Sequence, residues 1–352
     1  MADNCFWTTL AGVTQECAPS VVLPVGSLAY KDSLNKLISI SPTQGGYSDH
    51  GAIEVDGTPA VVGKLFSYDE KLLAIVGSDI HQAVTLPDFT FNSTPAMILN
   101  EGYPDTSDGV FRSVDDVGSD DFYESVDGIS WTNVHNWTIR VAPGYPEPLY
   151  WTKFGSRWVV CVRWNGTVGN RFMYSDNSGA SWLEGTGITG DGLNFPYRIF
   201  HVGGALIAVA AQTSYNTIFR STDGAAWSAV GAVSNPGSGS FPAANPLAYD
   251  GSNNVVFMSR DSWGNGGFRM QHSSDNGATW NTVDLPGDTN GWYQMQGVWF
   301  INGRFVLLTG GDSGSGNELV LTSTTGADGT WTTALTTPTA PFNNSVRATI
   351  IR

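Results

Sequence analysis

The sequence predicts an all-β fold assembled from a repeated four-stranded antiparallel unit, and three observations lead to this prediction. First, the 352 residues include 42 glycines and 13 tryptophans but only 14% charged residues, a composition typical of sheets joined by tight turns. Second, a short motif of Ser, Asp, Gly and Trp recurs along the chain. Third, paired runs of β-branched and aromatic residues precede each copy of the motif. The hydrophobic fraction of 41% is sufficient for a packed core.

The motif repeats with a nearly constant period. Its tryptophans are 51, 45, 53 and 51 residues apart, which is the length of one blade of a β-propeller. The fourth copy is the most complete, the second has Asn in the place of Asp, and the first and third are one residue shorter between Asp and Gly. The copies are Ser125, Asp127, Gly128 and Trp131; Ser175, Asn177, Gly179 and Trp182; Ser221, Asp223, Gly224 and Trp227; Ser273, Asp275, Gly277 and Trp280; and a degenerate fifth from Ser323 through Gly329 to Trp331.

Each residue type of the motif suits a tight turn between two strands. A short carboxylate or amide can accept hydrogen bonds from backbone N–H groups two or three residues further on. Gly supplies a residue with positive φ, which closes the turn. The Trp begins the next strand and is expected to pack over the hairpin.

This pattern resembles the Asp-box, or BNR, repeat of the sialidase-like superfamily, over about residues 120–335. The resemblance implies a β-propeller in which each box lies between the third and fourth strands of a blade and acts as a structural clasp rather than as a catalytic group.

The repeat divides the chain into blades of a single domain, residues 1–352. We expect a six-bladed propeller of four-stranded antiparallel blades, with seven blades as the alternative. The end segments 1–26 and 338–352 are expected to close the ring by pairing residues 6–10 with residues 345–351, because closure removes exposed edge strands. The blades are placed near 27–62, 63–138 with an insertion at 78–120, 146–188, 196–234, 245–287 and 295–337.

The face opposite the boxes is the predicted working face. In an antiparallel blade the turn after the second strand lies at the end away from the boxes, together with the connections between blades. Loops at that end contain glycines, aromatic residues and the long acidic insertion, which is the composition of a contact surface for a glycan or a protein. The ligand-binding candidates are Trp164, Tyr215, Trp263, Trp292, Tyr293, Asp105 and Asp108.

Enzymatic chemistry is not favoured. Sialidases of this scaffold use an arginine cluster, a Tyr–Glu pair and an Asp, and no such set can be assembled here, although Tyr197–Phe200 faintly resembles their Arg-Ile-Pro motif. The five histidines show no metal-ligand spacing, and no cofactor is predicted. The acids of the insertion could ligate Ca²⁺, but a solvated acidic loop is the favoured interpretation. With three cysteines the chain has no disulfide framework. Cys5 and Cys17 could pair under oxidising conditions, but three buried or semi-buried thiols are the favoured interpretation.

These observations favour a non-catalytic propeller in a larger assembly. The net charge of −15 disfavours nucleic acid as a partner, and the sequence predicts neither a membrane span nor a secretory signal. The leading hypothesis is a structural or adhesion component of a virion, such as a phage tail or head appendage, made in the host cytoplasm and binding a host glycan or a neighbouring virion protein. The alternatives are a sialidase-like glycoside hydrolase acting on surface polysaccharide and an intracellular assembly factor.

Overall fold

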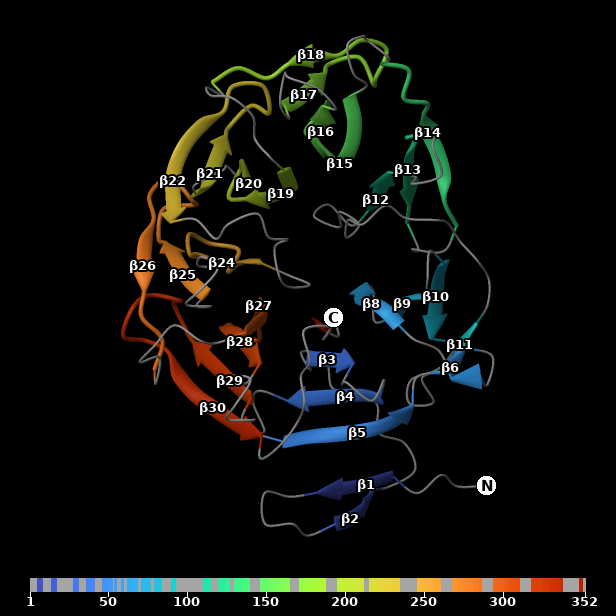
Figure 1. The fold of residues 1–352 in the computed structure, drawn as a ribbon, viewed down its shortest axis with the longest axis vertical. Helices are drawn as coiled ribbons and strands as arrows, with labels where there is room; N and C mark the ends of the chain where they lie inside the picture. The colour runs from blue at the N-terminus through green and yellow to red at the C-terminus, as the bar shows by residue number, and fades with distance from the viewer. Residues whose placement is uncertain are drawn as a thin grey trace. The chain divides into compact units, whose positions relative to one another are not determined.

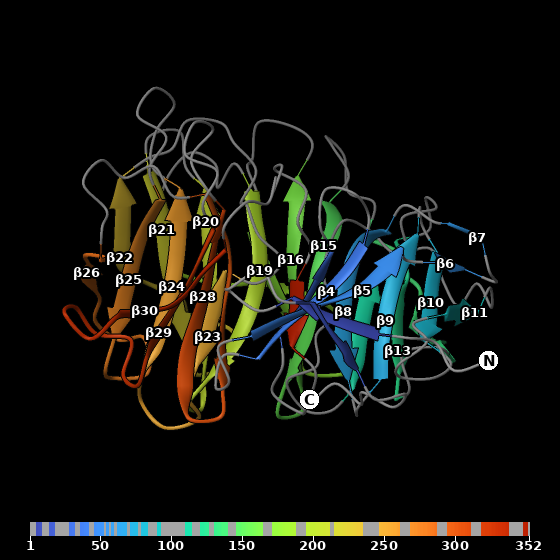
Figure 2. The same cartoon turned by 90° about the horizontal axis from the view of Figure 1, so that it is seen from below.

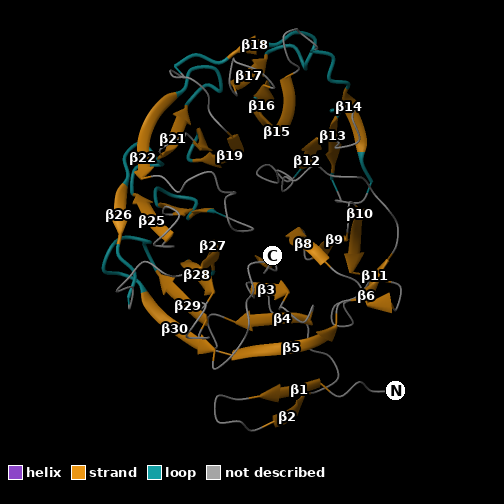
Figure 3. Ribbon diagram, in the orientation of Figure 1, coloured by secondary structure: helices purple, strands orange, loops and turns teal. Residues whose placement is uncertain are grey.

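The structure is a computed structural model, and it describes strands throughout the chain. Its described part consists of strands β1–β11 and β31, whose bounds are given below, and of residues 110–114, 120–126, 130–139, 146–164, 171–187, 195–211, 215–234, 246–260, 268–286, 294–310 and 318–337. In this part the secondary structure is strand and turn, with no helix (Figure 3). A helix of the length and apolarity needed to cross a membrane is accordingly not found among these residues.

The chain divides into two compact units, which are described separately. One unit contains residues 1–96, 242–248 and 285–352, and the other contains residues 97–241 and 249–284. Strand β23 (Leu247–Tyr249) spans the division between them.

The second unit is a series of antiparallel sheets whose strands run up and down side by side (Figure 1, Figure 2). The order within each sheet follows the chain, so each strand pairs with the next one in sequence. The sheets are β12 (Phe111–Val114), β13 (Phe122–Ser125) and β14 (Thr132–His135); β15 (Pro146–Phe154), β16 (Arg157–Trp164), β17 (Arg171–Ser175) and β18 (Leu183–Glu184); β19 (Phe195–Val202), β20 (Ala205–Ala211), β21 (Tyr215–Ser221) and β22 (Ser228–Ser234); and β24 (Val255–Arg260), β25 (Phe268–Ser273) and β26 (Asn281–Val283).

The first unit contains sheets from both ends of the chain. Strands β27 (Gln294–Ile301), β28 (Arg304–Gly310), β29 (Glu318–Ser323) and β30 (Thr332–Thr337) form one four-stranded sheet. A second has the order β31-β3-β4-β5, from β3 (Leu28–Lys31), β4 (Lys36–Ser41), β5 (Gly46–Ala52) and β31 (Ala348–Ile350). A six-stranded sheet contains β6 (Glu54–Val55), β7 (Thr58–Pro59), β8 (Val62–Tyr68), β9 (Lys71–Val76), β10 (Asp79–Ala83) and β11 (Thr90–Asn92), and β1 (Cys5–Thr8) pairs with β2 (Thr14–Cys17).

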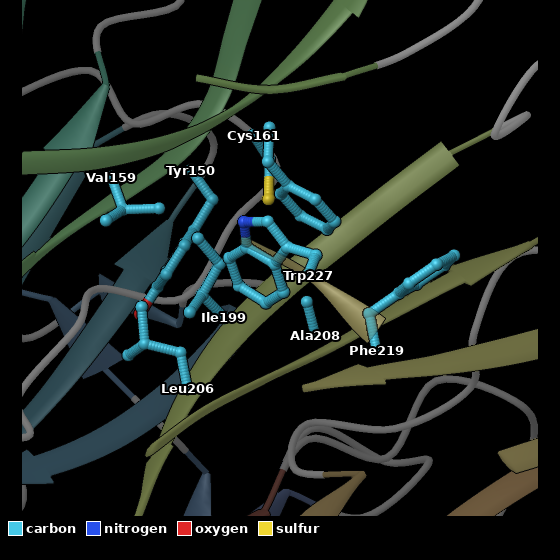
Figure 4. Packing of buried hydrophobic residues seen from close by; sticks show 9 residues of the cluster. Tyr150, Val159, Cys161, Ile199, Leu206, Ala208, Phe219 and Trp227 are labelled. Atoms are coloured by element: carbon cyan, nitrogen blue, oxygen red, sulfur yellow. The ribbon is translucent and has the colours of Figure 1, made fainter. Parts of the chain in front are cut away.

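The central strands are buried on both faces because sheets of the second unit pack face to face. In β16 the side chains alternate: Val159 and Cys161 face the sheet β19–β22, whereas Trp158, Val160 and Val162 face the sheet β12–β14. All five are buried, which explains why this strand is an unbroken apolar run and not an alternating one. Figure 4 shows the first of these cores, where Trp227 lies among Tyr150, Ile199 and Ala208.

Two details of the expected blade plan differ from the structure. The terminal strands do not pair with each other as expected, because β1 pairs with β2 and β31 pairs with β3. The range 63–138, which was assigned to one blade, contributes strands to two sheets, β8–β11 and β12–β14. The expected insertion at 78–120 therefore contains β10, β11 and β12. The register of β1 and β2 places Cys5 opposite Cys17, the two residues named as the less favoured disulfide alternative.

Candidate functional site

The repeated motif lies at the ends of strands. Its serine is the last residue of β13, β17, β21, β25 and β29, and the turn that follows leads into the outer strand of the same sheet. We call these turns the box loops: residues 125–131, 175–182, 221–227, 273–280 and 323–331. Residues 127–129 of the first loop, with Asp127 and Gly128, lie outside the described part, so the geometry below comes from the other four.

The serine hydroxyl binds the turn in the same way in each of these four box loops. Its Oγ accepts a hydrogen bond of 2.8 Å from the backbone N–H of Gly179, Gly224, Gly277 or Gly326. The glycine is four residues after the serine in the second and fourth loops and three residues after it in the third and fifth. The equal distance shows that the bond is kept whether two or three residues separate the serine from the glycine.

The residue two positions after the serine organises the rest of the loop. Asp275 Oδ1 accepts from the N–H of Thr279 at 2.8 Å, and Asp275 Oδ2 accepts from the Thr279 hydroxyl at 2.7 Å. In the second loop Asn177 Oδ1 accepts from the N–H of Ser181, while its Nδ2 donates to Ser181 Oγ, each at 2.8 Å. Asn can therefore take the place of Asp in this loop. The hydroxyl of Ser181 accepts a hydrogen bond from Asn177, whereas the hydroxyl of Thr279 donates one to Asp275.

These hydrogen bonds favour the ionised form of the box carboxylates. Burial acts to raise the pKa of Asp275, but the hydrogen bonds from Thr279, Ser273 and Ala278 together outweigh it and lower the pKa to about 2. For Asp223, burial is likewise opposed by hydrogen bonds from Ala226, Ala225 and Ser221, and the net effect lowers its pKa. A general acid needs the opposite shift, so these carboxylates have the properties of structural acceptors.

The box glycines of the third and fourth loops have a positive φ, and they leave no space for a Cβ atom. Gly277 has φ of 76°, and a Cβ at this residue would lie 2.6 Å from Cδ1 of Ile207, which belongs to the preceding sheet. Gly224 is similar, with a Cβ 2.7 Å from Val159 Cγ2 of its preceding sheet. Each loop thus lies directly against a neighbouring sheet, and a side chain at the glycine would push the two apart.

The box tryptophans also join neighbouring sheets. Trp227 is buried and stacks on Phe172 of the preceding sheet, with ring centroids 4.2 Å apart and planes 20° from parallel. Trp182 packs edge-on against Phe122 of its own preceding sheet at 5.7 Å. The expectation that the Trp packs over its own hairpin is therefore incomplete, because these two rings belong to the core between sheets.

The ligand-binding candidates fall at the other end of the sheets or outside the described part. Trp164 ends β16 and Tyr215 begins β21, in two sheets that contact each other, and both positions are at the strand ends away from the box loops. The strand backbones are described there, but the side chains are not. Trp263, Trp292, Tyr293, Asp105 and Asp108 lie outside the described residues.

Sequence reasoning did not single out the arginines that reach the box loops. Arg157, at the start of β16, binds Asp176 through Nε at 2.7 Å and through Nη2 at 3.0 Å, and its Nη1 donates to the backbone carbonyl of Asp223 at 2.6 Å. The hydrogen bond from Arg157 is the main cause of the lowered pKa of Asp176, whose side chain is exposed. No single sequence signal marks these arginines, because Arg157 begins the second strand of its sheet whereas Arg220 lies in the third strand of the next sheet, beside the box serine.

A second charged group joins the first two sheets of the unit. Glu124 Oε1 accepts from Arg112 Nε at 2.9 Å and lies 2.7 Å from Lys153 Nζ of the next sheet. Both cations lie within 6 Å of the ring of Trp151. This carboxylate is engaged by two cations, as expected for a residue that holds sheets together. Among the described residues no group of three or more His, Cys, Asp or Glu side chains is placed to hold a metal ion.

Comparisons with known proteins identify the fold. No family model matches the chain, and no curated protein matches its sequence. The GH74 xyloglucanase from Xanthomonas campestris matches with a TM-score of 0.50 and 12% identity, over 93% of this chain and 52% of that one. A prolyl endopeptidase matches with a TM-score of 0.50 and 10% identity, over 88% and 47%. A GH74 enzyme from Niastella koreensis gives 0.49 and 13%, over 90% and 55%.

The chain therefore spans about half the length of these solved structures. Such neighbours are β-propeller proteins, and together with the antiparallel four-stranded sheets they support a propeller fold. At these identities the likeness concerns the fold alone.

Replacing the box serine should destabilise the protein. Ser273→Ala leaves the buried N–H of Gly277 without its acceptor and should lower the free energy of unfolding by about 1–3 kcal/mol. Ser274→Ala, at the exposed neighbouring residue, should change it by less than about 0.5 kcal/mol. Urea denaturation measures both; equal effects of the two substitutions would show that the hydroxyl is not what holds the loop.

The glycine that contacts the preceding sheet should be less tolerant than a glycine in open space. Gly277→Ala combines a positive φ with a clash against Ile207 and should cost about 2–3 kcal/mol. Gly251→Ala has a similar φ of 80° but no atom near its Cβ, so it should cost only about 1 kcal/mol. If denaturation gives the same cost for both, the close contact between sheets does not contribute.

Asp275 should make stability depend on pH in the acid range. Its folded pKa of about 2 is below the reference value of 3.8, so its contribution is complete above pH 4 and is lost as the pH falls towards 2. Asp275→Asn should remove this part of the pH dependence while largely preserving stability at pH 7, because Asn177 shows how an amide fits. A carboxyl titration by NMR checks the shift, and a measured pKa near 4 would contradict it.

Proposed function

We propose that the chain is a non-catalytic β-propeller of Asp-box repeats that serves as a structural or adhesion component of a virion, in a tail or head appendage. It binds a host glycan or a neighbouring virion protein through the ends of its sheets opposite the box loops.

The observation that carries this proposal is the difference in residue chemistry between the two ends of the sheets in the second unit. At one end the box loops use their polar groups for hydrogen bonds within the loop and to the adjacent sheet. At the other end, β16 ends at Trp164 and β21 begins at Tyr215. Both are aromatic residues of the kind that stack on sugars or anchor a protein contact. A ligand would therefore bind at the end where the aromatic residues are.

Exposure in the described residues agrees with this assignment. The large exposed apolar side chains there are Val126 and Leu183, at 73% and 57%, and neither is aromatic. Among the side chains that the structure describes, none provides an exposed aromatic platform for a sugar. The aromatic candidates for such a platform are those at the opposite strand ends and in the loops beyond them.

The fold comparison supports a carbohydrate-related propeller in general terms. One neighbour is named a xyloglucanase, so its propeller fold is used in carbohydrate chemistry. For this chain the box carboxylates have lowered pKa values and the carboxylate of Glu124 is paired with two cations, which favours binding over hydrolysis.

Binding is tested with the purified protein on an array of bacterial surface polysaccharides. Trp164→Ala and Tyr215→Ala should each weaken binding about tenfold or more, in keeping with the loss of an aromatic anchor. Leu183→Ala, at an exposed apolar residue of an outer strand, is the matched control and should leave binding unchanged. Unchanged binding in both aromatic variants would contradict the assigned end of the sheets, and release of reducing sugar would contradict the non-catalytic assignment.

The virion assignment is tested separately. Mass spectrometry of particles purified from the native source should detect the chain in a constant ratio to capsid protein, and antibody labelling in electron microscopy should place it on a tail or head appendage. Its absence from every particle fraction would overturn this part of the proposal while leaving the binding assignment intact.

A further inference from the structure

The joint between the sheets β15–β18 and β19–β22 contains hydrogen bonds that cross from one sheet to the other. Thr186, just after β18, donates its N–H to the carbonyl of Ala225 at 2.9 Å and accepts from the N–H of Trp227 at 2.9 Å. This makes a parallel bridge between Thr186 and Ala226. We call residues 185–187 the strap, because they leave their own sheet and pair with the box loop of the next one.

Arg157 holds the same box loop from the start of β16. Its three guanidinium contacts divide between two loops: Nε and Nη2 bind the carboxylate of Asp176 in its own sheet, and Nη1 binds the carbonyl of Asp223 in the next. The guanidinium also lies over the ring of Tyr174, at 4.5 Å. The hydrogen bond to Asp176 raises the pKa of Arg157 against the effect of burial, so the group stays charged in this position.

Close packing accompanies these bonds. Trp227 is 2% exposed and stacks on Phe172, and a Cβ at Gly185 would lie 3.1 Å from the Phe172 carbonyl and 3.2 Å from the Ala225 carbonyl. A side chain at this residue would therefore press on two backbone carbonyls, one in each of the two sheets. Gly187, with φ of 84°, is in turn in close contact with the Trp227 backbone.

The next joint along the chain is held more simply. Arg220 Nε donates to the carbonyl of Asn276 at 3.2 Å, which is the counterpart of the Arg157 contact with Asp223. No strap equivalent to residues 185–187 is found between these two sheets within the residues described. The comparison gives a natural control, because the two arginines make related contacts and only the joint of Arg157 contains the strap among the described residues.

We propose that Arg157 and the strap form a lock that makes the sheets β15–β18 and β19–β22 open as one unit. The lock acts at the box end, whereas Trp164 and Tyr215 finish strands of the same two sheets at the other end. The lock therefore fixes the distance between Trp164 and Tyr215. The relevance of this distance to ligand binding rests on the proposed function, whereas the lock itself does not.

Native-state hydrogen exchange tests the lock without any ligand. In the unmodified protein the amides of Thr186 and Trp227 should exchange as slowly as those of β17 and β21, since all would open together. In Arg157→Met they should exchange about tenfold faster than the strand amides, because the bond to Asp223 and its charge are lost. Asp176→Asn keeps the contact with the Asp223 carbonyl, and the exposed ion pair contributes little, so acceleration should be less than about threefold.

Arg220→Met is the matched control, because it removes an arginine that binds a box loop at a different joint. It should leave the amides of Thr186 and Trp227 unchanged. The lock would be overturned if these amides were unaffected by Arg157→Met, if Arg220→Met accelerated them equally, or if all strand amides accelerated together with them. Should Arg157→Met not fold, Arg157→Lys keeps the charge without the fork of donors, and the same comparison applies with the same outcomes.

Discussion

The hydrogen bond from a glycine N–H to a serine hydroxyl is the interaction on which the described sheets depend. It closes the turn between the third and fourth strands at 2.8 Å in four box loops, whether the glycine is three or four residues after the serine. Both atoms are withdrawn from water, so the bond is not exchanged for a bond to solvent without a large cost. Once the turn is closed, the tryptophan that follows it is directed into the core between two sheets.

Neighbouring sheets meet through these same loops. The glycine leaves room for a side chain of the preceding sheet, the tryptophan stacks on an aromatic ring of that sheet, and an arginine binds a backbone carbonyl of the loop. A box loop is therefore both a turn within its sheet and a joint to the next. Two of the arginines in this sparsely charged chain, Arg157 and Arg220, bind at such joints.

The sequence predicted the repeat and the strands around it because both depend on local chemistry. Ser273, Asp275 and Gly277 are recognisable from their spacing alone, and the structure places such serines at strand ends. The partners across a joint were not predictable, since Arg157 and Asp223 are 66 residues apart and meet only when two sheets pack. The pairing of the chain ends was also misjudged, because the choice among β1, β2, β3 and β31 depends on which edges lie close, and the motif carries no information about that.

Amide exchange at the box glycines of the unmodified protein tests the central claim most directly. If the serine hydroxyls close the loops as described, the amides of Gly179, Gly224, Gly277 and Gly326 will be protected as strongly as those of the buried strand β20, although they lie in turns. Exchange as fast as that of an exposed turn residue such as Ser274 would contradict the claim, and with it the role of the box loops as joints between sheets.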